Sequence, residues 1–110
     1  MADDAQRSLA AGHIVQQENS RTIADGLRTS LGDKTFAVLS RHVRGIGTAS
    51  EDGIIRAMRM MWEKMKIIVE PSSSVPLACL IEGTIDVRGL KVGIVLTGGN
   101  VDLDRLPWQS

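Results

Sequence analysis

The sequence of 110 residues has few aromatic side chains and no excess of charge of either sign. Aromatic residues make up 3% of it and Tyr is absent, so a platform of stacked rings for binding bases or sugars is not expected. The 13 basic and 13 acidic residues cancel, which removes the electrostatic attraction that nucleic acids and anionic membranes exert on basic proteins. No nucleic-acid partner and no membrane partner is therefore predicted.

Cysteine and long apolar runs are also scarce. The single cysteine, Cys79, lies in the apolar stretch "VPLACLIEG", which suits a buried thiol in a reducing compartment better than a disulfide framework. No apolar stretch approaches the length that spans a bilayer, and the beginning "MADDAQRSLAAG" is acidic where a secretory signal would be basic. A cytoplasmic location is expected.

The length suits one domain over residues 1–110, and no internal boundary is visible. Capping residues and apolar spacing predict helices over residues 3–11, 33–43, 51–66 and 71–82, with a turn near residues 23–27 and a short terminal helix in "LDRLPW". In this scheme Ser50 caps the third helix, while Gly12 and Gly83 end the first and the fourth.

Two apolar segments favour β-strands. "KIIVE" at residues 66–70 is brief and doubtful, whereas "LKVGIVL" at 90–96 is apolar at nearly every position, as in a strand buried on both faces. Helices alternating with such strands indicate an α/β protein with three layers. Because one convincing strand is too few for a parallel sheet, the sequence predicts part of a larger domain: an incomplete sheet flanked by helices.

The strand end "VLTGGN" at residues 95–100 is the first candidate for chemistry. In open α/β sheets, ligands bind beyond the carboxyl ends of the strands. Thr97 would offer a hydroxyl there, and Gly98 and Gly99 permit close approach of the backbone. From these residues alone, an ordinary glycine turn remains the more common interpretation.

Three blocks change that balance: "TIADGLRTSLG" at 22–32, "WEKMKIIVEPSSSVPLA" at 62–78 and "VGIVLTGGNVDL" at 92–103. Their order and spacing resemble the C-terminal part of the serine/threonine dehydratase and serine racemase family, most closely the branch of serine racemase and 3-hydroxyaspartate dehydratase. These are fold-type II enzymes dependent on pyridoxal 5'-phosphate. The resemblance covers nearly the whole chain and implies a C-terminal portion of a three-layer domain of that type.

The resemblance assigns cofactor contacts to Gly26, Glu70, Thr97 and Gly98. Thr97 stands where a serine usually meets the pyridine nitrogen, Gly26 would pass beside the cofactor, and Glu70 would lie close to the ring. A neutral hydroxyl does not force protonation of the ring nitrogen, which allows β-elimination to compete with transamination. Lys66 and Asn100 match positions that bind a regulatory nucleotide in some racemases.

The stretch "ADDA" resembles the divalent-cation site of the same branch. The resemblance implies that the carbonyl of Ala2 and the carboxylate of Asp4 are ligands, and oxygen ligands suit Mg²⁺ or Ca²⁺. The family's third ligand, an upstream glutamate, is not in the sequence. We therefore do not expect this chain alone to hold either ion tightly.

The same resemblance places no catalytic residue in this chain. The family's Schiff-base lysine, its phosphate-binding glycine loop and its reprotonating serine lie upstream, and none of Lys34, Lys64, Lys66 and Lys91 matches them. Ser73 and Ser74 also depart from the family, in which glycine and alanine are common there.

Two interpretations remain open. The first is a piece of a homodimeric lyase or racemase that acts on serine, threonine or 3-hydroxyaspartate and is inactive without the rest. The second is a truncated, non-catalytic chain that associates with a full-length relative or is unstable.

Overall fold

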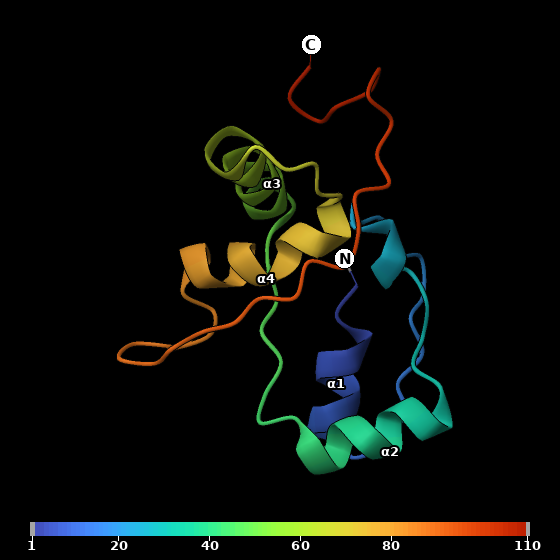
Figure 1. The fold of residues 1–110 in the computed structure, drawn as a ribbon. Helices are drawn as coiled ribbons and strands as arrows, with labels where there is room; N and C mark the ends of the chain where they lie inside the picture. Colours follow the sequence, from blue (N-terminus) through green and yellow to red (C-terminus); the bar gives the residue numbers. More distant parts are fainter. Residues whose placement is uncertain (1, 110) are drawn as a thin grey trace.

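The computed structural model describes residues 2–109, in which the helices follow the predicted order (Figure 1). They are α1 (Asp4–Ala11), the short 3-10 helix η1 (Asp25–Leu27), α2 (Asp33–His42), α3 (Glu51–Met65) and α4 (Pro71–Glu82). α3 packs extensively against α4, and α1 packs against α2 at the other end of the molecule. η1 contacts α4.

The helix ends carry the predicted signals. The Ser50 side chain accepts the backbone N–H of Gly53 at 3.0 Å and so caps α3. Gly12 (φ 76°) and Gly83 (φ 68°) end α1 and α4 in the left-handed conformation, which costs a residue without a β-carbon little. Lys66 ends α3 with a positive φ of 57°.

The core is small and rich in short or flexible side chains. One buried cluster consists of Ala24, Ile54, Ala57 and Ala78. The second consists of Met58, Met61 and Val69, and Trp62 and Trp108 pack against it. The two tryptophan rings meet each other edge to face, with their centroids 5.3 Å apart. The methionines of α3 differ in burial, since Met58 and Met61 belong to the core while Met60 and Met65 are 44% and 57% exposed. Trp108 packs against the buried cluster and so connects the C-terminal segment to α3.

The predicted sheet is not confirmed, because no residue between 2 and 109 has the paired hydrogen bonds of a strand. Among the described residues, one backbone hydrogen bond connects the segment 66–70 with the chain after residue 90, from the Glu70 N–H to the Gly98 carbonyl at 3.1 Å. A strand requires a ladder of such bonds with a neighbour. The neighbours that this segment needs are not among the described residues.

The predicted terminal helix at residues 103–108 is wrong. The chain there forms turns, with the Asp104 N–H donating to the Asp102 carboxylate at 3.0 Å. An aspartate side chain that binds the backbone two residues on competes with helix formation, and Pro107 removes a backbone donor.

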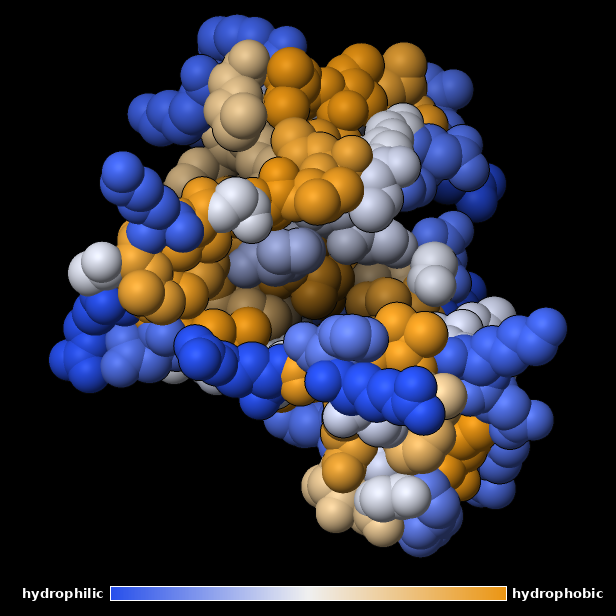
Figure 2. Space-filling model, turned by 60° about the horizontal axis from the view of Figure 1, so that its bottom comes forward, coloured by the Kyte–Doolittle hydropathy of each residue, from blue (hydrophilic) through white to orange (hydrophobic). Residues whose placement is uncertain are grey.

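The molecule is more open than a compact domain of its size. Its surface area of 7750 Å² exceeds the about 5,900 Å² expected for a compact monomer of 11.9 kDa. Its radius of gyration is 14.5 Å, against about 13 Å for a compact chain of this length. Hydrophobic side chains line a hollow across the face shown in Figure 2, and on the 90–97 segment Leu90, Val92 and Val95 are 63%, 48% and 77% exposed.

The shape is flat, with principal extents of 41, 37 and 20 Å. Within residues 2–109, no helix combines the length and the apolar character needed to cross a membrane.

One polar cluster joins the N-terminus of α3 to the C-terminus of α4. The Glu82 carboxylate accepts the Ser50 hydroxyl and, at 3.0 Å, the Ser50 N–H, while Arg56 lies 3.8 Å away. Gly53 leaves room for this carboxylate, because a β-carbon there would collide with it. The Ser50 hydrogen bonds, with help from the Arg56 charge, hold the pKa of Glu82 below its ordinary value of 4.5.

This cluster predicts a pH-dependent contribution of Glu82 to folding. A carboxyl group whose pKa is lower in the folded state stabilises the fold above its unfolded pKa, and the contribution is lost as the pH falls through its folded pKa. We expect Glu82→Gln to lower the free energy of unfolding at neutral pH, with a difference from wild type that shrinks below about pH 4.5. Urea unfolding across that range measures this, and Glu18→Gln, in an exposed loop, is the control. A difference independent of pH would contradict it.

Candidate functional site

The N-terminus of α4 gathers the predicted cofactor residues from three parts of the chain. Glu70 immediately precedes the helix, and its N–H binds the Gly98 carbonyl. The Ser72 hydroxyl accepts the Gly26 N–H at 3.1 Å. Gly26, Glu70, Thr97 and Gly98 therefore lie around one helix end, although up to 72 positions separate them along the sequence.

Ser73 holds Thr97 and Gly98 in place. Its hydroxyl accepts the N–H of Thr97 at 3.0 Å and the N–H of Gly98 at 2.8 Å. The same oxygen lies 2.9 Å from the Gly98 carbonyl and 3.0 Å from the Thr97 hydroxyl. Ser73 is 1% exposed, whereas Thr97 is exposed, so a buried hydroxyl supports one that an incoming molecule can reach.

The two glycines after Thr97 have different roles. A β-carbon on Gly98 would lie 2.6 Å from a carboxylate oxygen of Glu70, so the missing side chain leaves room for that carboxylate. A β-carbon on Gly99 would lie 2.6 Å from the backbone carbonyl of Ile68. The Gly-Gly pair therefore admits a charged side chain on one side and a neighbouring backbone on the other.

Lys66 and Asn100 were both predicted to contact a regulatory nucleotide. Lys66 is exposed at the end of α3. Asn100 borders a cavity of about 160 Å³ between η1 and the C-terminal turns, and Lys66 does not line this cavity. Nothing in the described residues tests the predicted nucleotide contact.

Ala2 and Asp4 face different surroundings. Ala2 borders a cavity of about 550 Å³, while Asp4 is 4% exposed and is not among the lining residues. One carboxylate oxygen of Asp4, Oδ2, is buried without a hydrogen-bond partner. No group of three or more acidic, histidine or cysteine side chains converges within residues 2–109. An unpaired buried oxygen fits a cation ligand, but the residues present supply one carboxylate only.

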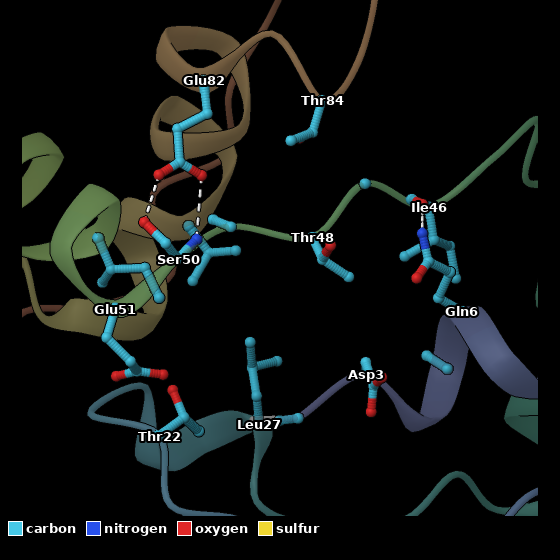
Figure 3. A pocket seen from close by; sticks show the side chains of 16 residues that line it. Asp3, Gln6, Thr22, Leu27, Ile46, Thr48, Ser50, Glu51, Glu82 and Thr84 are labelled. Atoms are coloured by element: carbon cyan, nitrogen blue, oxygen red, sulfur yellow. Dashed lines mark hydrogen bonds between the residues drawn. The ribbon is translucent and has the colours of Figure 1, made fainter.

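The cavity of about 550 Å³ lies between α1, η1, residues 46–49 and α4, and none of the predicted cofactor contacts lines it (Figure 3). Its charged and amide side chains are already engaged. Glu82 binds Ser50, Glu51 accepts the Ile23 N–H at 2.8 Å, and Gln6 donates to the Ile46 carbonyl at 2.9 Å. Because its polar groups hold the protein together, we assign the chemistry to the end of α4 instead.

Comparisons with known proteins identify the family of this chain. A family model described as pyridoxal-phosphate dependent enzyme matches residues 1–98. The chain is 47% identical over 108 residues to β-hydroxyaspartate dehydratase of Paracoccus denitrificans, covering 98% of the chain and 34% of that enzyme. It is 46% identical over 114 residues to serine racemase of Arabidopsis thaliana, covering 99% of the chain and 34% of the racemase. The structure of maize serine racemase matches 94% of the chain and 33% of the racemase, with 40% identity and a TM-score of 0.87.

The chain belongs to the family of pyridoxal-phosphate dependent enzymes. Its structural neighbours include serine racemases and a threonine deaminase of fold type II. The chain spans about a third of the length of the relatives it matches.

The sequence indicated Ser73 only as a departure from the glycine common in the resembled family, and it assigned no contact to Ser72. The structure makes both of them supports for the predicted contacts. A signal was present, since three hydroxyl side chains directly after a proline at the first turn of a helix are well placed to bind nearby backbone groups. Which backbone they would bind could not be read from the sequence.

The two glycines predict unequal effects of alanine. At Gly99 the obstacle is the Ile68 backbone, so Gly99→Ala should lower the free energy of unfolding by about 1–3 kcal/mol. At Gly98 the obstacle is the end of a mobile Glu70 side chain, so Gly98→Ala should cost less than about 1 kcal/mol. Urea unfolding of both variants measures the difference, and a larger loss for Gly98→Ala would contradict the assignment.

Proposed function

We propose that this chain forms the wall of a pyridoxal-phosphate site that meets the pyridine ring, in a lyase or racemase acting on serine, threonine or 3-hydroxyaspartate. The observation that carries the proposal is the convergence of Gly26, Glu70 and Thr97–Gly98 at the start of α4. The names of the relatives, a hydroxyaspartate dehydratase and serine racemases, support the reaction class.

The residues present fit the ring end of the cofactor. Pyridoxal phosphate, when bound, supplies the electron sink for chemistry at the α-carbon of an amino acid. Thr97 offers an exposed hydroxyl to a ring nitrogen, and Glu70 brings a half-buried carboxylate beside it. Lys34, Lys64, Lys66 and Lys91 lie outside this hydrogen-bonded cluster.

In this proposal the rest of the site comes from the other two thirds of a fold-type II subunit, in a homodimer. That portion would also supply strands to pair with residues 90–97 and cover the apolar side chains exposed there. The three-layer sheet predicted from the sequence would then form around this wall.

The chain alone is expected to be inactive. Purified chain treated with pyridoxal phosphate and then with borohydride should show, by mass analysis, no single preferred lysine adduct, and it should not turn over L-serine. The reason is that none of its four lysines lies in the cluster around Thr97. A specific adduct at one lysine together with turnover would sink this prediction.

Thr97 can be tested when the chain is combined with its missing partner. Co-expression with residues that precede the matched region of the Paracoccus dehydratase supplies a lysine and a phosphate site. Thr97→Val, which removes the hydroxyl but keeps the shape, should lower turnover by about 10²–10³. Thr97→Ser keeps the hydroxyl and is the matched control. Equal activity of the Val and Ser variants would remove Thr97 from the site.

The second candidate function is a non-catalytic chain that associates with a full-length relative. The large surface area and the exposed side chains of residues 90–97 favour it. Sedimentation of the purified chain, alone and with such a relative, tests this idea. A chain that remains a monomer, does not bind the relative and unfolds in one sharp transition would contradict this idea.

A metal role is proposed for Asp4. Its buried Oδ2 lacks a partner in the described residues, and a divalent cation would satisfy it. Thermal unfolding with and without Mg²⁺ or Ca²⁺ should show a small upward shift in Tm that Asp4→Asn abolishes and Asp3→Asn, with its side chain paired to Arg7, retains. No shift in wild type would contradict a cation site in this chain.

A further inference from the structure

We infer that Ser73 is a positioning residue that fixes the hydroxyl of Thr97 as a hydrogen-bond donor toward a bound ligand. The inference rests on the proposed function, since the ligand atom it concerns is the ring nitrogen of the cofactor. It concerns a residue at which the sequence departs from the glycine common in the resembled family.

The argument begins with the protons around Ser73. A hydroxyl has one proton and two lone pairs. The N–H groups of Thr97 and Gly98 both donate to the Ser73 oxygen, at 3.0 and 2.8 Å, and together they occupy both lone pairs. Ser73 therefore cannot accept a third proton.

The single proton of Ser73 has two acceptors within reach, the Gly98 carbonyl at 2.9 Å and the Thr97 hydroxyl at 3.0 Å. Whichever acceptor it uses, the Thr97 hydroxyl cannot donate to Ser73. Among residues 2–109 no other acceptor contacts the Thr97 hydroxyl. Its proton is left for a molecule that arrives from the exposed side.

This arrangement discriminates between ligand atoms. A heteroaromatic nitrogen without a proton accepts the Thr97 proton and completes the network. A protonated ring nitrogen would instead need Thr97 as an acceptor, and the Thr97 proton would then lack a partner once water is excluded. Ser73 thus biases the site toward the unprotonated ring.

Ser73 also limits the motion of Thr97. Threonine is branched at its β-carbon and has few side-chain rotamers for a given backbone. With the backbone N–H groups of Thr97 and Gly98 bound to a helix side chain that is 1% exposed, the direction of the Thr97 hydroxyl is set by α4. Glycine at position 73 has no hydroxyl to provide this support.

The first measurement uses the purified chain without ligand. In Ser73→Ala, amide hydrogen exchange at Thr97 and Gly98 should rise about fivefold to tenfold, and the scalar couplings of Thr97 should change from one rotamer to an average. Ser74→Ala is the matched control, because Ser74 is equally buried but its hydroxyl binds only the Glu70 carbonyl, at 3.0 Å. If Ser73→Ala fails to fold, Ser73→Gly replaces it.

The second measurement uses the chain co-expressed with the portion of the Paracoccus dehydratase that precedes the matched region, because the proposed function places the phosphate site there. To this assembly, wild type or variant, it adds 4'-deoxypyridoxine 5'-phosphate labelled with ¹⁵N in the ring. This probe lacks the aldehyde and cannot react with lysines. In wild type and Ser74→Ala, the nitrogen signal should be that of an unprotonated ring accepting a hydrogen bond. In Ser73→Ala and Thr97→Val it should move toward the signal of the free probe.

The outcomes separate the two ideas. Unchanged exchange and couplings at Thr97 in Ser73→Ala would overturn the role of Ser73, as would a wild-type nitrogen signal that indicates a protonated ring. If the probe does not bind wild type at any concentration, the proposed function fails, while exchange and couplings still decide whether Ser73 positions Thr97.

Discussion

The cluster of hydrogen bonds at the first turn of α4 is the constraint on which the rest of the structure depends. Through Glu70, Ser72 and Ser73 this one turn holds the 22–32 segment and the 97–99 segment. The Glu70 N–H can bind the Gly98 carbonyl because backbone N–H groups at the start of a helix lack partners within the helix. The hydroxyls of Ser72 and Ser73 accept backbone N–H groups of the two segments. Core packing of Ala24 and the hydrogen bond from the Ile23 N–H to Glu51 also hold the 22–32 segment. The extended segments form no sheet of their own within residues 2–109.

Local signals made the helices predictable. Ser50, Pro71 and Gly83 act within a turn of where they stand, so spacing and capping were enough to place α3 and α4. The predicted terminal helix is absent for reasons that are also local. The Asp102 side chain binds the backbone at Asp104, and Pro107 lacks a backbone donor. The predicted sheet could not be tested in this way, because a strand is defined by a neighbour rather than by its own residues.

The resemblance predicted which residues meet at one helix end but not how they are held there, and their contact with a cofactor stays a prediction. The resemblance named Gly26, Glu70, Thr97 and Gly98, and the structure brings these residues together. It could not indicate that Ser73 would bind both amides, because that requires the distance between α4 and a segment 24 residues further along the chain. Residues that depart from a family pattern carry information of this kind, since their contacts are specific to the chain that has them.

The thickness of the molecule, 20 Å along its shortest axis, has a consequence for chemistry. The buried clusters within residues 2–109 are small, and Thr97 is an exposed residue outside them. A hydroxyl such as that of Thr97 then works against a solvent of high dielectric constant, in which a single hydrogen bond contributes little to selecting one protonation state over another. The same hydroxyl gains its effect only when a second body covers it and excludes water. The flat chain therefore forms one wall of the proposed site, and the electrostatic environment of the Thr97 hydroxyl depends on what covers that wall.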